Sequence, residues 1–375
     1  MSATAAEPFR CAHAAGADWQ SAAAQVLRQL GPAAGANLGF VYVSDLFADD
    51  VEALLGFLRQ RTGIENWLGT VGVGICATGV EYFDRPAIAA MVGRLPQARF
   101  AFFDSVRHDL NEFIAERRDW LRPDAGNFGV VHVDPRRGEL FRLLPLFAEA
   151  TGSFLVGALT SSRGKHAQLA GGLTEGGISG LLMSPDVAVA TALTQGCTPI
   201  GPSHEVTEAR QNVAVTLDGR PALEVFREDI GELLARDLQR CAGYIYAAVP
   251  VSGSDWGDYM VRNLAGIDER KGLVAIGDVL HTGQRLMFCR RDKQAAAADL
   301  GRMLAGLKRR LAGPPRGALY HSCLARGANL FDTESVELGM IREALGDVPL
   351  VGFFGNGEIS NSRLYTYTGV LTLFQ

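Results

Sequence analysis

Two charged side chains, Arg326 and Glu358, follow short apolar segments and lie among small residues. Arg326 comes after a predicted strand that ends near Ser322, and Glu358 ends the glycine-rich segment 353–358 (FFGNGE). A guanidinium group can hold a ligand carboxylate through two hydrogen bonds, a contact worth roughly 1.5–3 kcal/mol. We therefore predict that both residues line one pocket for a small ligand. The alternative is an internal ion pair between them, which is compatible with ligand binding because a ligand can replace an internal partner.

The neighbours of Arg326 and Glu358 complete the predicted ligand site. Its members are Cys323, Arg326, Gly327, Asn356, Gly357 and Glu358. Because glycine allows positive φ, residues 355–357 form either a ligand loop or a tight structural turn. Cys323 could act as a nucleophile with His321 as its base, but the sequence shows no carboxylate that would orient the histidine. A small buried thiol is the other interpretation, so we assign no catalytic residue and keep an enzyme that uses Cys323 as an alternative.

The seven histidines include no pair at the spacing of metal ligands, so the sequence predicts no metal site. His166, His204 and His281 lie in predicted loops and are candidate axial ligands of haem. A haem site also needs a broad apolar slot. His132 and His321 lie within predicted strands, where we expect them to be packed and hydrogen-bonded.

Composition and motifs exclude several classes of protein. A net charge of -5 and a pI near 5.9 provide no basic surface for nucleic acid. No segment approaches the roughly 18 apolar residues of a membrane span, and the amino terminus lacks the pattern of a signal peptide. The six cysteines have no CxxC spacing, so we expect reduced thiols and a cytoplasmic location. Motifs for nucleotide binding and for hydrolases are incomplete or absent.

An internal repeat supplies the elements that must position these residues. Each copy has an apolar strand, a helical stretch, a second strand with a Val-Gly pair, a short link and a third strand. The first strands are expected at 39–43, 129–133 and 317–321, and the last at 87–91, 178–183 and 369–373. Because the link is too short for a crossover helix, we expect the last two strands to pair antiparallel. The predicted fold class is α/β, with mixed sheets, antiparallel strand pairs and covering helices, built from strand–helix–strand–strand units in two domains.

Several segments resemble a known family, the FIST sensory proteins. They are residues 259–263 (YMVRN), 283–285 (GQR), 291–292 (RD), 323–327 (CLARG), 351–358 (VGFFGNGE) and 367–371 (YTGVL). In the first half of the chain the resemblance rests on the Val-Gly strands, on Gly176 and Gly177, and on a predicted hairpin of strands 212–217 and 221–226. The resemblance implies a segment 1–35 that contains a helix, a FIST N-like domain over 36–230 and a FIST C-like domain over 231–375.

The resemblance also implies a function. Such a chain is a bacterial-type two-domain sensory module for signal transduction, and the small ligands it implies are amino acids or similar small carboxylates. The sequence shows no output domain of its own, so we expect a signalling partner such as a histidine kinase or a cyclase, and neither nucleic acid nor a membrane. Some similar proteins are described as haem-binding nitric oxide sensors, which makes haem the cofactor of the alternative function.

Overall fold

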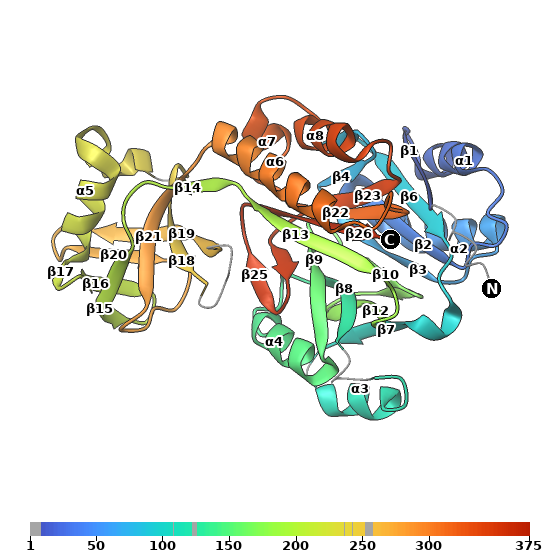
Figure 1. Ribbon diagram of the computed structural model, residues 1–375, viewed down its shortest axis with the longest axis horizontal. Coiled ribbons are helices and arrows are strands. Elements are labelled where there is room, and N and C mark those ends of the chain that lie inside the picture. Colours follow the sequence, from blue (N-terminus) through green and yellow to red (C-terminus); the bar gives the residue numbers. More distant parts are fainter. Residues whose placement is uncertain (1–8, 108, 122–125, 236, 242, 252–257) are drawn as a thin grey trace. The chain divides into compact units, whose positions relative to one another are not determined.

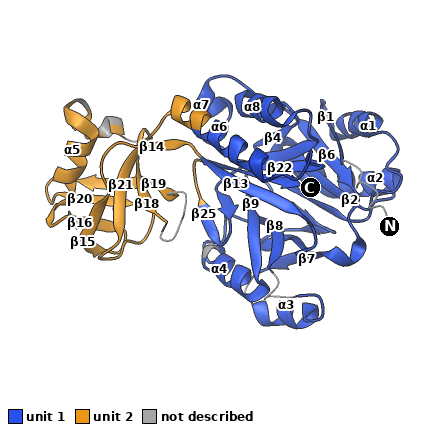
Figure 2. Cartoon of the chain, viewed as in Figure 1, with its two compact units in different colours: residues 1–194, 299–364, 368–375 blue, residues 195–298, 365–367 orange. Residues whose placement is uncertain are grey.

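The computed structural model describes residues 9–375 except 108, 122–125, 236, 242 and 252–257 (Figure 1). Residues 1–8 of the predicted segment 1–35 therefore lie outside the described residues, whereas its helix lies inside them. The chain forms two compact units (Figure 2): unit 1 contains residues 1–194, 299–364 and 368–375, and unit 2 contains residues 195–298 and 365–367. Neither unit is one continuous segment, so the two units do not test the predicted domain boundary between residues 230 and 231. That boundary stays a prediction.

Unit 1 contains three copies of one structural repeat. The first copy comprises β1 (Arg10–Ala15), α1 (Trp19–Leu30), β2 (Leu38–Ser44), α2 (Val51–Thr62), β3 (Trp67–Gly72), β4 (Gly74–Ala77), β5 (Val80–Phe83) and β6 (Ala87–Gly93). The second comprises β7 (Phe100–Val106), α3 (Leu110–Arg117), β8 (Asn127–Val133), α4 (Leu140–Thr151), β9 (Ser153–Leu159), β10 (Gln168–Ala170), β11 (Leu173–Thr174) and β12 (Ile178–Met183).

The third copy has the same order but is interrupted. It comprises β13 (Val189–Gln195), α6 (Lys293–Arg310), β22 (Gly317–Cys323), α7 (Ala328–Phe331), α8 (Val336–Leu345), β23 (Leu350–Gly355), β24 (Glu358–Ser360), β25 (Arg363–Tyr365) and β26 (Thr368–Phe374). Nearly all of unit 2 lies between β13 and α6 in the chain, as an insertion into this repeat. Short 3-10 helices span Asp45–Asp50 and Gln97–Arg99 in unit 1 and Leu238–Cys241 in unit 2.

Local sequence explains the individual elements. Helix α1 begins where the Asp18 carboxylate accepts a hydrogen bond from the Ser21 amide at 2.7 Å, and it buries Ala22, Val26 and Leu30, which recur at helical spacing. Strand β2 is buried along its whole length, because it has a neighbouring strand on each side and is covered on both faces. The predicted helices at 50–61 and 294–311 correspond to α2 and α6.

The three repeats share one strand arrangement. In each copy the first two strands of the predicted unit are parallel, as in β2 with β3, β8 with β9 and β22 with β23. The last strand, β6, β12 or β26, pairs antiparallel with the first strand of its copy. The repeat is therefore confirmed, and β3 and β6 belong to one sheet. The prediction that the second and third strands of each unit pair with each other is wrong. The third strand instead pairs with the first strand, on the edge opposite the second strand.

The link hairpins are exchanged between the repeats. Strand β4 pairs with β23 of the third repeat, β10 pairs with β3 of the first, and β24 pairs with β9 of the second. Each of the three six-stranded sheets in unit 1 thus receives its last two strands from another copy. This cyclic exchange gives unit 1 a pseudo-threefold arrangement and places all three predicted links at the carboxyl ends of parallel strands.

One central core joins the three sheets. It includes Phe40, Val130 and Leu319, which occupy equivalent positions in the first strand of each repeat. Because successive strand residues point to opposite faces, the next residues lie in three outer cores. There, Val41 packs in a core with α1 and α2, Val131 in one with α3 and α4, and Tyr320 in one with α6 and α8.

Unit 2 is an antiparallel sheet with a helical segment, α5, that is kinked at Gly231. Its elements are β14 (Cys197–Pro199), β15 (His204–Arg210), β16 (Val213–Leu217), β17 (Arg220–Pro221), α5 (Ala222–Ala235), β18 (Ile245–Pro250), β19 (Tyr259–Asp268), β20 (Leu273–Ile276) and β21 (Arg285–Arg291). The predicted strand 212–217 is confirmed as β16. The predicted strand 221–226 is wrong, because β17 stops at Pro221 and the following residues form α5. This helix buries Leu223, Phe226 and Ile230 in the core of the unit.

Candidate functional site

Arg326 is completely buried in unit 1, and its ion-pair partner is Glu337 of α8. The Arg326 Nε lies 2.8 Å from Glu337 Oε1, and Nη2 donates to the same oxygen. The other oxygen, Oε2, accepts the Gly327 amide at 3.0 Å. The sequence analysis named Glu358 as the internal partner of Arg326. The carboxylate that pairs with this guanidinium is Glu337, which sequence reasoning missed.

Glu358 lies in the same buried cluster. Its Oε2 accepts hydrogen bonds from the Thr368 hydroxyl at 2.8 Å and from the Thr368 amide at 3.2 Å. Burial raises the pKa of Glu358 to about 8, although Thr368, Arg326 and Cys323 all act in the opposite direction. Glu81 of β5 accepts the Ala328 amide at 2.9 Å, and burial raises its pKa to about 7. The Arg326 guanidinium is therefore buried in unit 1 together with two carboxyl groups, Glu358 and Glu81, whose pKa values lie near neutral pH.

The structure brings together most of the predicted ligand-site residues. Cys323, Arg326, Gly327 and Glu358 belong to the buried cluster, and Gly357 is buried beside Glu358. Asn356, in contrast, is exposed. None of the six lines either of the two cavities described below, so their role in ligand binding stays a prediction.

His321 is poorly suited to serve as a base for Cys323. It lies in the central core, where its Nε2 is 3.1 Å from the Tyr42 hydroxyl. Burial lowers the pKa of His321 to about 3, so the imidazole is a weak base and is neutral near pH 7. The thiol is buried as well. The alternative of catalysis by Cys323 therefore gains no support from its surroundings.

The three candidate haem ligands differ in how their rings are engaged. His204 uses both ring nitrogens, with Nδ1 2.6 Å from Asp218 and Nε2 3.0 Å from Asp229. His166 places Nδ1 3.1 Å from the Gly164 carbonyl oxygen, and His281 is exposed. None of the three lines either cavity described here. An axial ligand needs a free ring nitrogen, so the two engaged nitrogens argue against His204, and the haem alternative stays a prediction.

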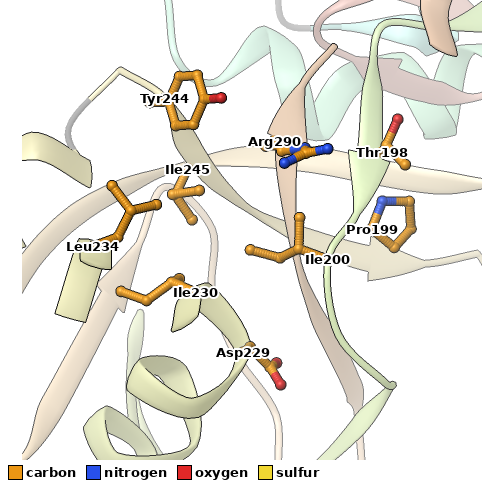
Figure 3. Close-up of a pocket in the computed structure, with 9 residues that line it drawn as sticks. All are labelled: Thr198, Pro199, Ile200, Asp229, Ile230, Leu234, Tyr244, Ile245 and Arg290. Atoms are coloured by element: carbon orange, nitrogen blue, oxygen red, sulfur yellow. The ribbon is translucent and has the colours of Figure 1, made fainter. Parts of the chain in front are cut away.

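A cavity of about 370 Å³ lies in unit 2 (Figure 3). We call it the unit 2 cavity. Its walls come from β14, α5, β18 and β21 and from the residues beside them, and they consist of Thr198, Pro199, Ile200, Asp229, Ile230, Leu234, Tyr244, Ile245 and Arg290. Four aliphatic side chains and one aromatic ring provide apolar surface, whereas Asp229 and Arg290 provide opposite charges. Pockets for small molecules commonly combine apolar walls with a few polar groups in this way.

The two charged groups of the unit 2 cavity differ in how they are held. His204 fixes the Asp229 carboxylate through Oδ2. Burial raises the pKa of Asp229, and the contact with His204 opposes that rise. The Arg290 side chain is 49% exposed, and its Nη2 lies 3.6 Å from Asp292 Oδ2, beyond hydrogen-bond distance. A fixed carboxylate and an available guanidinium therefore line one cavity.

Sequence reasoning missed every residue of the unit 2 cavity. A helix through Ile230 and Leu234 is expected from the sequence, but the prediction of a strand at 221–226 obscured the start of α5, the helix that also carries Asp229 to the cavity. One signal lay close by, since residues 291–292 belong to a segment that carries the family resemblance and directly follow Arg290.

In the described ranges no group of three or more His, Cys, Asp or Glu side chains is arranged to hold a metal ion. Within the same ranges, no helix is long and apolar enough to cross a membrane.

Comparisons with known proteins place the chain among described sequence families. Residues 37–220 match the family model of the FIST N domain, and residues 222–361 match that of the FIST C domain. The junction of the two matches lies inside unit 2. The uncharacterized protein Rv0628c of Mycobacterium tuberculosis is 29% identical over 345 residues, which cover 87% of this chain and 88% of that protein. The uncharacterized protein Mb0898c of Mycobacterium bovis is 32% identical over 199 residues, or 51% of each chain.

Proposed function

This chain belongs to the FIST family, with a FIST N domain followed by a FIST C domain, and from this premise we propose that it senses free amino acids. FIST domains are associated with sensory and signal-transduction roles. The unit 2 cavity is the proposed binding site. A cytoplasmic location and a signalling partner such as a histidine kinase or a cyclase complete the proposal.

The observation that carries this proposal is the presence of Asp229 and Arg290, with several aliphatic side chains, in the lining of one cavity. A free amino acid is a zwitterion, so its carboxylate suits the guanidinium of Arg290 and its ammonium group suits the carboxylate of Asp229. The aliphatic walls suit an apolar side chain, which favours amino acids such as leucine or methionine. A cavity of about 370 Å³ is in the size range of small-molecule pockets.

Binding of modest strength is sufficient for a sensor of metabolites. Dissociation constants from micromolar to millimolar correspond to about 4–8 kcal/mol. One charge-assisted contact of roughly 1.5–3 kcal/mol is then a large share of the total. Loss of the Arg290 guanidinium is expected to weaken binding at least about tenfold, because each tenfold change corresponds to about 1.4 kcal/mol.

The test is calorimetric titration of the twenty amino acids into the wild type and into Arg290→Gln. Arg270→Gln is the matched control, because Arg270 is an exposed arginine of unit 2 outside the cavity. We expect an apolar amino acid to bind the wild type and the control equally and Arg290→Gln at least about tenfold more weakly.

A third variant, Arg326→Lys, separates the two locations. It keeps the charge of the buried cluster but loses the planar fork of the guanidinium. If Arg326→Lys loses amino acid binding while Arg290→Gln keeps it, the ligand occupies the site predicted from Arg326 and Glu358, and the unit 2 cavity is not the binding site. Failure of every amino acid to bind the wild type would contradict the proposal itself.

A further inference from the structure

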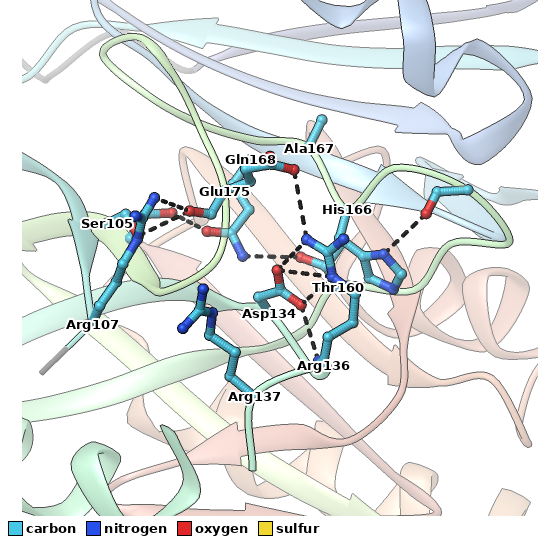
Figure 4. A network of polar contacts seen from close by, with 12 residues as sticks. Ser105, Arg107, Asp134, Arg136, Arg137, Thr160, His166, Ala167, Gln168 and Glu175 are labelled. Carbon is cyan, nitrogen blue, oxygen red and sulfur yellow. Dashed lines mark hydrogen bonds and ion pairs between the residues drawn. The ribbon is translucent and has the colours of Figure 1, made fainter. Parts of the chain in front are cut away.

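A second cavity, of about 500 Å³, lies in unit 1 within the second repeat. Figure 4 shows the polar contacts around five of its lining residues. It is formed by the residue after β7, the turn after β8 and the connection from β11 to β12. Its lining residues are Arg107, Asp134, Arg136, Arg137, Glu175 and Gly176. We call it the arginine cavity. Three guanidinium groups meet only two carboxylates there, so the lining carries one excess positive charge.

The carboxylate of Asp134 is occupied by Arg136. Asp134 is completely buried, and the Arg136 Nε lies 2.9 Å from Oδ1 while Nη2 lies 2.5 Å from Oδ2. Arg136 Nη2 also lies 3.5 Å from Glu175 Oε2, in a pair whose side chains are 50% and 60% exposed. Both carboxylates of the lining, Asp134 and Glu175, therefore form ion pairs with Arg136.

Arg107 and Arg137 have weaker partners. Arg107 donates to two neutral oxygens, the Ser105 hydroxyl at 3.1 Å and the Glu175 carbonyl at 2.9 Å. Arg137 lies 3.7 Å from the Glu139 carboxylate in an exposed pair. An exposed ion pair at that distance contributes little free energy. Within the described part of the chain, neither arginine has a carboxylate in hydrogen-bond range.

Gly176 keeps a space open between these two arginines. A Cβ atom at this position would lie 3.6 Å from Arg137 Nε and 3.7 Å from Arg107 Nε. The residue has φ +81°, a conformation that L side chains rarely adopt. A larger residue would be strained here and would occupy the space that both guanidinium groups border.

The repeat shows how Arg137 differs from its counterpart. Strand register aligns Val131 with Gly157 in the second repeat and Tyr320 with Gly352 in the third, so Arg137 and Arg326 follow equivalent strand positions. Arg326 is buried against Glu337, a residue of α8. Arg137 is exposed and has only the distant Glu139. An arginine that forms an internal pair in one repeat is thus available to a ligand in the other.

We propose that the arginine cavity binds a phosphate group, either as the free ion or on a small metabolite. Arg107 and Arg137 would hold the phosphate oxygens, because guanidinium groups bind such oxyanions through paired hydrogen bonds. The cavity has room for an organic part beside the phosphate. This site is independent of the amino acid site, since all its residues belong to unit 1.

The test is calorimetric titration at low ionic strength with inorganic phosphate and with glycerol 3-phosphate. The variants are Arg107→Gln and Arg137→Gln, and the matched control is Arg142→Gln, an exposed arginine of α4 outside the cavity. We expect saturable binding to the wild type, a loss of about tenfold or more in both cavity variants, and a change of less than about twofold in the control.

The two ligands separate the sources of the phosphate. Tighter binding of glycerol 3-phosphate assigns the site to a phosphorylated metabolite, whereas equal affinities assign it to the free ion. Absence of saturable binding to the wild type would overturn the proposal. An equal loss in Arg142→Gln would also overturn it, because it would indicate a general effect of surface charge. Melting temperatures of the variants show whether each one is folded.

Discussion

At the scale of single residues, the three repeats place Tyr42, His132 and His321 at equivalent positions of their first strands. All three are buried, and the Tyr42 hydroxyl lies 3.3 Å from His132 Nε2 and 3.1 Å from His321 Nε2. A hydroxyl can donate to one ring nitrogen and accept from the other. Burial lowers the pKa of both histidines. The prediction that His132 and His321 are packed and hydrogen-bonded is confirmed.

Glu358 gives the protein a pH-dependent stability that can be tested. Its pKa is raised from 4.5 to about 8 in the folded state, so the folded protein holds a proton that the unfolded chain has lost. The stabilisation from this group is complete below the unfolded pKa and is lost as the pH rises through about 8. Both buried histidines are neutral in the folded state and titrate near pH 6.5 in the unfolded chain, so they raise the stability as the pH rises, and they do so equally in the wild type and in Glu358 variants.

We therefore expect the contribution of Glu358 to the free energy of unfolding to fall by about 1 kcal/mol per pH unit between pH about 6.5 and 8.5, and Glu358→Gln to remove this contribution from the pH dependence. Glutamine remains neutral and can still accept the Thr368 hydrogen bonds. Urea denaturation across this range measures the effect, with Glu343→Gln, an exposed residue of α8, as the control. Parallel pH profiles for the wild type and Glu358→Gln would contradict this account. Glu81 is present in all three proteins, so its contribution cancels.

At the scale of elements, each repeat needs a glycine where its two parallel strands meet. A Cβ atom at Gly69, Gly157 or Gly352 would lie 1.7–1.8 Å from the carbonyl oxygen of the facing strand. Such a distance is far below any van der Waals contact. The Val-Gly pairs of β9 and β23 that revealed the repeat in the sequence are therefore a consequence of strand packing.

Gly69→Ala is expected to destabilise the protein by about 3 kcal/mol or more, because its methyl group would collide with the Val41 carbonyl in a rigid core. The matched control is Gly56→Ala on α2, where no atom lies within 4 Å of the added Cβ. There we expect a gain of about 0.5–1 kcal/mol from helix propensity. Denaturant titration compares the two. A Gly69→Ala protein as stable as the wild type would contradict the close approach of β2 and β3.

At the scale of the whole molecule, unit 2 is largely an insertion into a three-repeat unit. The ends of the insertion are close together, because the Thr194 hydroxyl donates to Asp299 Oδ2 at 2.8 Å. Both residues belong to unit 1. A short linker can therefore span the gap, since loop closure over a short distance costs little entropy.

A variant that lacks residues 195–298, with Thr194 and Asp299 joined by a short Gly-Ser linker, is expected to fold. It should lose amino acid binding and keep phosphate binding, because the two proposed sites lie in different units. Circular dichroism melting and calorimetric titration check both statements. Deletion of residues 74–83 is the control that should unfold the protein, because it removes β4, which pairs with β23, and β5, which pairs with β4. An excised variant without a cooperative transition would show that unit 1 needs unit 2.

The sequence by itself determined the repeat, the α/β class and the family. These depend on local features, namely apolar strands, helical spacing and short motifs, which neighbouring residues specify. Local pattern also misled in one place, where the alternation at 221–226 predicted a strand and the apolar face of those residues instead formed part of α5.

Only the tertiary structure decided which segments meet. The exchange of hairpins between repeats pairs β4 with β23, whose residues are more than 250 positions apart. Glu337 reaches Arg326 because α8 folds over β22, and the unit 2 cavity combines Asp229 with Arg290 from separate elements. Local sequence pattern sets the face and length of a strand but not its partner, because pairing depends on backbone hydrogen bonds that every strand can form. The partners of the charged residues could be known only once the sheets were closed around their common core.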